Sequence, residues 1–97
     1  MSFSFDQKLK VTPDTLINVI EGESVLLNLK SETYFGLDQI GTRMWALLTT
    51  SDSIQAAYEA LLDEYDVSAD ALRQDMRDLI EKLLGNGLVE VVREKAA

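Results

Sequence analysis

The sequence predicts an α+β fold, in which a three-stranded antiparallel sheet is followed by three helices. Apolar and β-branched runs separated by short polar turns fill residues 16–35. From residue 37 onward the apolar residues recur at the spacing of an α-helix. Two polar breaks, at residues 49–53 and 66–68, divide this second part into three helices. A chain of 97 residues has the size of a single domain.

The strands are predicted from alternation and from the turns between them. The first is Leu16–Ile20, which ends at the turn Glu21-Gly22-Glu23. The second is Ser24–Leu29, and the third, after a polar turn over residues 30–32, is Thr33–Phe35. In the second strand, one face holds Val25, Leu27 and Leu29, and the other holds Ser24, Leu26 and Asn28. Short connections make this an antiparallel meander, with the second strand in the middle and the third at an edge.

The helices are predicted from their caps and their apolar stripes. Asp38 is an N-cap for the first helix, the second begins near Ser51 or Ser53, and Ser68 caps the third. The run Gly85-Asn86-Gly87 ends the third helix, because these residue types accept the left-handed conformation of a C-cap. The stripe of the third helix consists of Leu72, Met76, Leu79, Ile80, Leu83 and Leu84.

A short terminal strand over Leu88–Val92 completes the predicted order of elements. Three helices with a small sheet are the outline of a winged helix-turn-helix-like domain. We expect one such domain over residues 16–92, a flexible or partly ordered segment over residues 1–15, and a C-terminal tail over residues 93–97.

The charge of the chain disfavours two classes of partner. With 17 acidic and 9 basic residues the net charge is −8. Nucleic acids and anionic membranes both attract Lys and Arg, so we expect neither as a partner. There is no run of 18 apolar residues, no signal-peptide pattern and no cysteine, so we expect a cytoplasmic protein. A basic protein partner stays open, and the oligomeric state is either monomer or homodimer.

The residues for catalysis are few. The absence of His and Cys removes the usual general base, the thiol nucleophile and the common zinc ligand sets. The carboxylates fit solvated helix faces, and none has the spacing of a calcium loop or is joined to a glycine-rich phosphate loop. We therefore expect no enzymatic activity, no metal and no cofactor.

Two other non-enzymatic classes are disfavoured by particular residues. Winged helices often bind DNA through the third helix, but here that helix interleaves acids with Arg73, Arg77 and Lys82. The run Asp52-Ser53-Ile54 resembles the phosphopantetheine site of acyl carrier proteins. A role as helix N-cap explains Ser53 more simply, and carrier proteins are all-helical.

The edge strand is the most specific feature of the pattern. An edge strand presents unpaired N–H and C=O groups, which proteins usually protect with charge or proline. Residues 33–36 contain neither. If the third helix packs beside this strand, the two form a groove in which an extended peptide can add as a further strand. Alternation sends one of Tyr34 and Phe35 to the core and the other to the opposite face.

Three blocks of the chain resemble the PqqD-like family, whose members are recognition elements for ribosomally made, modified peptides. The blocks are Gly22–Leu29, Thr33–Asp38, and Gly41–Trp45 with Leu47-Leu48. The resemblance spans residues 16–92 and includes Gly87-Leu88-Val89. It is strongest to the stand-alone proteins of lasso-peptide gene clusters. One departure is Phe35, where the family commonly has a pair of tyrosines.

The resemblance implies a leader-binding function. Such proteins bind the leader of a precursor peptide against the third strand, over the third helix, and present it to a maturation enzyme, in lasso pathways a leader peptidase. On this chain the implied peptide-binding residues are Thr33, Tyr34, Phe35, Gly36, Leu37, Leu72, Asp75, Met76, Leu79 and Leu83. Two alternatives remain: a PqqD-type peptide chaperone for a radical-SAM enzyme, and a winged-helix adaptor between proteins that binds no peptide.

Overall fold

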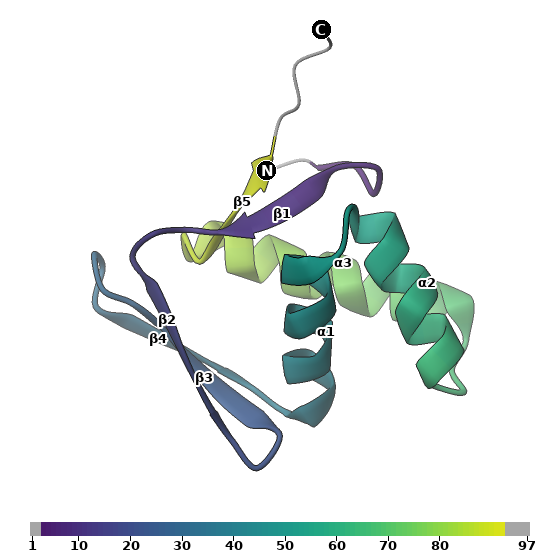
Figure 1. The fold of residues 1–97 in the computed structure, drawn as a ribbon, viewed down its shortest axis with the longest axis horizontal. Coiled ribbons are helices and arrows are strands. Elements are labelled where there is room, and N and C mark those ends of the chain that lie inside the picture. Colours follow the sequence, from purple (N-terminus) through teal and green to yellow (C-terminus); the bar gives the residue numbers. More distant parts are fainter. Residues whose placement is uncertain (1–2, 93–97) are drawn as a thin grey trace, which may run out of the picture.

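The helices lie together on one side of the molecule, and a three-stranded sheet projects from them as an arm (Figure 1). The computed structural model describes residues 3–92. Its elements are β1 (Lys8–Val11), β2 (Thr15–Ile20), β3 (Glu23–Asn28), β4 (Thr33–Leu37), α1 (Gln39–Thr50), α2 (Ile54–Glu64), α3 (Ala69–Gly85) and β5 (Val89–Val92). The α+β class and the order of the predicted elements are confirmed.

The projecting sheet is the predicted meander. Its order is β2-β3-β4 and both pairings are antiparallel, so β3 is central and β4 is an edge strand. The connection between β2 and β3 is a two-residue turn in which Glu21 and Gly22 have φ of 53° and 83°. Two successive left-handed residues match the twist of a hairpin, and glycine at the second position adopts that conformation without strain.

A second, two-stranded sheet joins the ends of the chain. β1 pairs antiparallel with β5, with Leu9 opposite Val91. β5 confirms the predicted terminal strand, whereas β1 lies in the segment expected to be flexible or partly ordered. β1 has four residues and one fully buried side chain, Leu9, so alternation within the segment is too short to predict a strand. Its pairing partner lies about 80 residues later in the chain. The predicted tail, residues 93–97, lies outside the described residues.

Residues before β1 also pack on the helices. Phe5 is buried, its ring meets the Tyr58 ring edge-on, and the Arg73 guanidinium lies 4.0 Å from its ring centroid. The Phe5 and Gln7 carbonyls accept hydrogen bonds from the first two amides of α2 at 2.7 and 2.8 Å. The N-terminal segment thus satisfies amides that a helix start would otherwise leave unpaired.

The helix caps follow the sequence prediction. Asp38 accepts a hydrogen bond from the Gly41 amide at 2.7 Å, and Ser53, rather than Ser51, caps α2 through the Ala56 amide at 3.0 Å. Ser68 is the N-cap of α3. That helix ends at Gly85, and Gly87 is the left-handed residue that follows it, with φ of 69°.

The core fills the space between the three helices and both sheets. Its largest fully buried side chains are Leu9, Leu26, Leu48, Ile54, Leu61, Met76, Ile80, Leu83 and Leu88. On β3 the buried face is the one that holds Ser24, Leu26 and Asn28. The two polar members have hydrogen-bond partners on or next to the helices: Ser24 bonds to Thr42 of α1 at 2.7 Å, and the Asn28 side-chain amide donates to the carbonyl of Asn86, just after α3, at 2.9 Å. These bonds remove the cost of burying polar groups.

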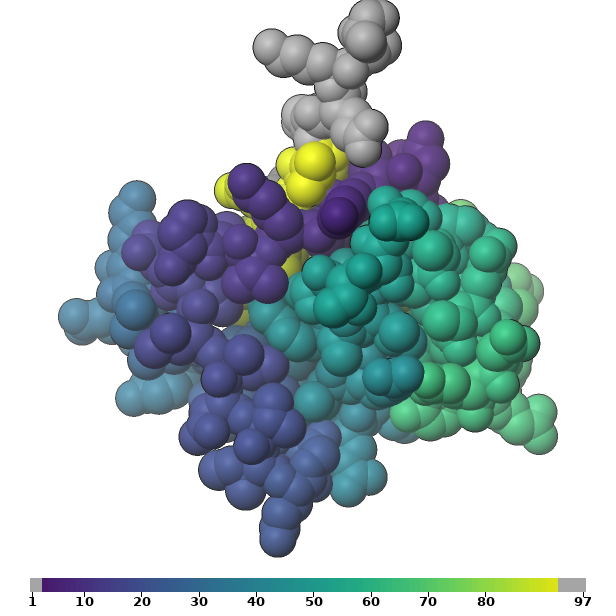
Figure 2. Space-filling model, viewed as in Figure 1, coloured from purple at the N-terminus to yellow at the C-terminus, as the bar shows by residue number. Residues whose placement is uncertain are grey.

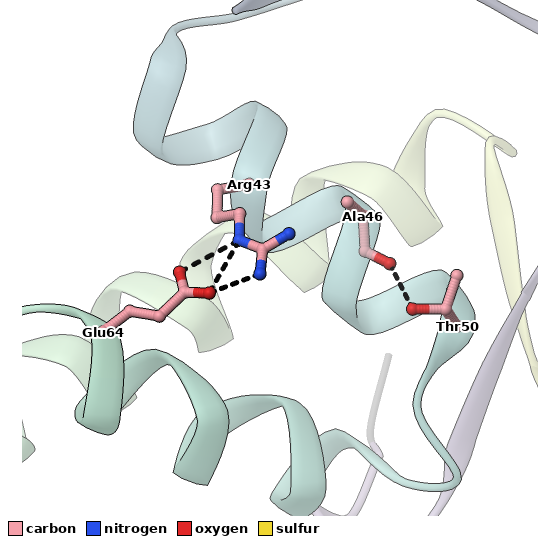
Figure 3. A network of polar contacts seen from close by, with 4 residues as sticks. All are labelled: Arg43, Ala46, Thr50 and Glu64. Atoms are coloured by element: carbon pink, nitrogen blue, oxygen red, sulfur yellow. Dashed lines mark hydrogen bonds and ion pairs between the residues drawn. The ribbon is translucent and has the colours of Figure 1, made fainter.

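An ion pair on the surface joins α1 to α2. The Arg43 guanidinium donates to both carboxylate oxygens of Glu64 (Figure 3). The hydrogen bond from Arg43 lowers the pKa of the Glu64 carboxyl below its ordinary value, and the same bond raises the pKa of Arg43. The pair connects the first helix to the last turn of the second (Figure 3).

Candidate peptide-binding groove

A groove of about 450 Å³ lies between β4 and α3, beside the start of α1. Its lining from β4 and the α1 cap is Phe35, Gly36, Leu37 and Asp38; from α1, Ile40, Gly41 and Met44; and from α3, Asp75, Asp78, Leu79 and Lys82. Phe35 and Leu79 are partly buried and pack against the core. One wall of the groove is therefore an edge strand and the other is a helix, the arrangement expected if the third helix packs beside the third strand of the meander.

The backbone of β4 faces the groove at alternate residues. In an antiparallel pair, residues that exchange both hydrogen bonds alternate with residues that exchange none. In a two-residue hairpin the residues flanking the turn, here Ile20 and Glu23, form an exchanging pair. The Leu29 amide donates to the Asp14 carbonyl at 2.8 Å. Asp14 and Leu29 each lie six residues from the pair at the turn, Ile20 and Glu23, so this bond fits the same alternation. Odd-numbered residues of β3 therefore bond to β2.

The even-numbered residues of β3 consequently direct their backbone groups toward β4. Their partners in the register are Thr33, Phe35 and Leu37. The two residues between them, Tyr34 and Gly36, direct their N–H and C=O groups away from β3. Because β4 is the edge of its sheet, these groups are open to another strand.

The helix wall runs antiparallel to the strand wall. The Asn28 side chain bonds to the Asn86 carbonyl, just after α3, and Asn28 pairs with Thr33 at the beginning of β4. The end of α3 therefore lies beside the beginning of β4. Asp75, two turns before Lys82, lies toward Leu37 and the start of α1, which line the same groove.

The structure separates the ten residues implied by the resemblance into three groups. Those that line the groove are Phe35, Gly36, Leu37, Asp75 and Leu79. Those in the core are Leu72, Met76 and Leu83, which are 5%, 0% and 0% exposed. Thr33 is exposed at the beginning of β4, and Tyr34 is on the opposite face of the sheet, where its side chain is 76% exposed. Of the two adjacent aromatics, Phe35 thus faces the groove.

The groove also contains residues that the sequence analysis did not assign to it. Asp78 and Lys82 belong to the same helical stripe as Asp75 and Leu79, at spacings of three, four and seven residues, so helical periodicity contains the signal. Ile40 and Met44 come from α1, one turn apart. Their contribution depends on how α1 leaves β4, which the sequence pattern does not specify.

The polar groups of the groove are three carboxylates and one ammonium. Asp38 is engaged as the α1 cap, and Asp78 accepts a hydrogen bond from Gln74 at 2.9 Å. Within residues 3–92, Asp75 has no side-chain hydrogen bond, and neither ion pair of the structure includes Asp75, Asp78 or Lys82. The groove therefore offers a ligand open backbone groups, apolar surface and charges without partners.

The face of the arm opposite the groove is largely apolar and exposed. The register places Leu16, Ile20, Val25, Leu27 and Tyr34 on this face, together with Asn18 and Glu23. Leu16 is 54% exposed and Ile20 is 62% exposed. The hairpin of β2 and β3, purple to blue in Figure 2, stands beside the helical part of the molecule. Scattered apolar residues are normal on a surface, whereas a contiguous set on one sheet face indicates a contact site.

Two classes of site are missing from the part of the chain that the structure describes. No group of three His, Cys, Asp or Glu side chains is placed to hold a metal ion. No helix among these residues is long and apolar enough to cross a membrane.

The chain matches the model of a known protein family, and comparison with curated proteins gives no match. The matching family is described as coenzyme PQQ synthesis protein D (PqqD), and the match covers residues 23–89. That range contains β3, β4 and all three helices, and therefore the whole groove.

Two solved structures resemble this fold. The first is TbiB1 in complex with the TbiA(beta) leader peptide, with 33% identity and a TM-score of 0.78 over 88% of this chain and 99% of that one. The second is a lasso peptide synthetase B1 complexed with the leader peptide, with 22% identity and a TM-score of 0.76 over 86% and 98% of the two chains. At that identity the second likeness supports the fold alone.

Proposed function

Since this chain belongs to the PqqD family, we propose that it is a non-catalytic recognition protein that binds the leader of a ribosomally synthesised precursor peptide. The leader adds as a strand to β4, over α3. One observation supports this most directly: the open backbone groups of Tyr34 and Gly36 border a groove whose other wall is a helix. The relative with 33% identity is a complex with a leader peptide.

Strand addition explains why the site combines open backbone with few side-chain contacts. Backbone hydrogen bonds supply affinity for any extended chain, and alternate side chains of that chain enter the groove for specificity. Tyr34 and Gly36 offer up to four such bonds, each worth about 0.5–1.5 kcal/mol net. Ordering a disordered leader costs several kcal/mol, so micromolar to sub-micromolar affinity is the expected range.

The complex raises the local concentration of the core peptide near the enzyme that processes it. A leader held on this protein keeps its core peptide near a maturation enzyme that binds the leader poorly by itself. We propose that this enzyme is the leader peptidase of a lasso-peptide pathway, working in the cytoplasm. A PqqD-type chaperone for a radical-SAM enzyme would use the same groove and differ in the enzyme that it serves.

The exposed apolar face of the arm supports a role in presentation. The Tyr34 side chain lies on this face, and its backbone is open at the leader-binding edge. A maturation enzyme that docks on Leu16, Ile20 and Val25 would therefore also contact a leader bound at β4. Replacement of Leu16 with Ser should then lower leader-dependent processing and leave leader affinity unchanged.

Fluorescence anisotropy tests the proposal. Labelled synthetic leaders from small precursor genes beside the gene for this protein are titrated with the purified protein, and at least one should bind saturably. Binding of none would refute leader recognition. An adaptor between folded proteins makes the opposite prediction: a basic folded partner binds, and extended peptides do not.

A further inference from the structure

We propose that the groove selects a leader with a defined order of charges, in which a basic residue is followed two positions later by an apolar residue and four positions later by an acidic one. This inference rests on the proposed function, because it specifies the peptide that adds to β4. It is carried by the spacing of Asp75, Leu79 and Lys82 along the helix wall.

The helix wall has an acidic end and a basic end. Asp75 and Asp78 lie toward Leu37, and Lys82 lies toward the beginning of β4, with Leu79 between them. These three charges have no ion-pair partner within residues 3–92. Asp75, Asp78 and Lys82 are exposed in the free protein, and a peptide bound in the groove would cover them, lower the local dielectric constant and so strengthen their attraction to opposite charges on the peptide.

The repeat of a strand matches the spacing of these residues. Leu79 lies about 6 Å along the helix axis from Asp75, at about 1.5 Å per residue. Two residues of an extended chain span about 6.6 Å and place their side chains on the same face. A peptide side chain opposite Asp75 is therefore followed, two residues later, by one opposite Leu79. The next residue on that face lies within reach of the long Lys82 side chain.

The direction of the added strand fixes the order of the charges. Both pairings of the sheet are antiparallel, and an antiparallel strand on β4 continues that pattern with the more stable arrangement of hydrogen bonds. Such a strand begins at the Leu37 end and finishes at the Thr33 end. It therefore meets Asp75 first, Leu79 second and Lys82 last. A parallel strand would require the reverse order.

A library of random 20-residue peptides displayed on phage tests the order without knowledge of the natural leader. Selection is carried out on the purified protein, on Asp75→Asn, and on Glu81→Gln as the matched control. Glu81→Gln removes the same charge from the same helix at an exposed position that does not line the groove. Peptides enriched on the wild type and on Glu81→Gln should share the order basic, apolar, acidic at alternate positions. Asp75→Asn should lose the basic preference and keep the apolar one.

Affinity measurements on one selected peptide give the second result. Changing its basic residue to Glu should raise the Kd on the wild type about tenfold and on Asp75→Asn less than threefold. At about 1 M salt, where the Debye length is about 3 Å, the two peptides should bind the wild type about equally. The inference would be overturned if the enriched peptides shared an apolar pattern without the charge order, or if Asp75→Asn enriched peptides with the same charge order as the wild type. Either result would leave strand addition intact. Absence of any enriched peptide would overturn both.

Discussion

Gly36 provides the sharpest test of strand addition, because proline at this position removes a backbone group from the edge alone. The alternation of hydrogen bonds directs the Gly36 N–H away from β3, so Gly36→Pro breaks no bond between β3 and β4. Proline is tolerated in edge strands for this reason. Phe35→Pro would instead remove a bond inside the sheet, together with an aromatic side chain that packs against the core.

The size of the effect follows from the bonds that are lost. The missing N–H removes one hydrogen bond to the leader, and the proline ring occupies the space of that bond. The ring thereby also weakens the bond to the neighbouring carbonyl. Two bonds at about 1 kcal/mol each raise the Kd for a leader about 30-fold. Gly36→Ala is the matched comparison, because it adds a Cβ that meets nothing within 4 Å in the free protein and keeps the N–H, so that the difference between the two variants isolates the lost N–H and the proline ring.

A second control lies on the other edge of the sheet. The same alternation directs the Val19 N–H away from β3 at the β2 edge, so Val19→Pro removes an equivalent group on the far side. The assay is anisotropy of a labelled leader, with far-UV circular dichroism and thermal denaturation to verify folding. A folded Gly36→Pro that binds as tightly as Gly36→Ala would refute addition at β4. Loss of binding in Val19→Pro alone would move the site to β2.

Other predictions concern stability and the helix wall. Met76→Ala should lower the free energy of unfolding, measured by chemical denaturation, by about 2–5 kcal/mol, because the Met76 side chain is 0% exposed. Leu79→Ala should instead mainly weaken leader binding, measured by anisotropy, because Leu79 lines the groove. Asn28→Ala should cost about 1–3 kcal/mol in the same denaturation assay, since it leaves the Asn86 carbonyl after α3 and the Lys30 and Ser31 amides in the turn after β3 without their partner. Arg43 lowers the pKa of Glu64 in the folded state. Their pairing therefore stabilises the fold at pH values above 4.5, the ordinary glutamate pKa, and this stabilisation is lost as the pH falls through the lower folded pKa. Glu64→Gln should therefore reduce stability slightly at pH 7 and change it little at a pH below the folded pKa of Glu64; an equal loss under both conditions would contradict this.

The elements of the fold that depend on local signals were predictable from the sequence. Alternation, turn residues and caps act within a few residues of one another, and they located β2, β3, β4 and the three helices. β1 escaped prediction because its stability comes from pairing with β5 at the far end of the chain. A strand of four residues with two lysines has no local pattern that indicates burial.

The face of β3 that is buried is the less apolar of its two faces, so hydropathy alone would predict the other one. Val25, Leu27 and Leu29 make one face wholly apolar, yet the face that packs on the helices is that of Ser24, Leu26 and Asn28. The polar side chains are accommodated because each meets a partner on a helix or on the turn that follows α3. Such partners are set by tertiary packing, so the sequence pattern alone does not reveal them. The same packing decides that Leu72, Met76 and Leu83 fill the core while Leu79 reaches the groove.

At Gly36, the residue type is explained neither by the preference of a strand nor by the packing of the fold around it. Glycine within a strand costs about 0.5–1 kcal/mol relative to alanine. Neither a left-handed backbone nor a close neighbour requires glycine here, since its φ is outside the left-handed region and its missing Cβ would meet only open space. A glycine that the fold does not need, in a strand that borders the groove, is typical of a place where another backbone approaches closely. The cost in stability is then explained by the strand that binds beside it.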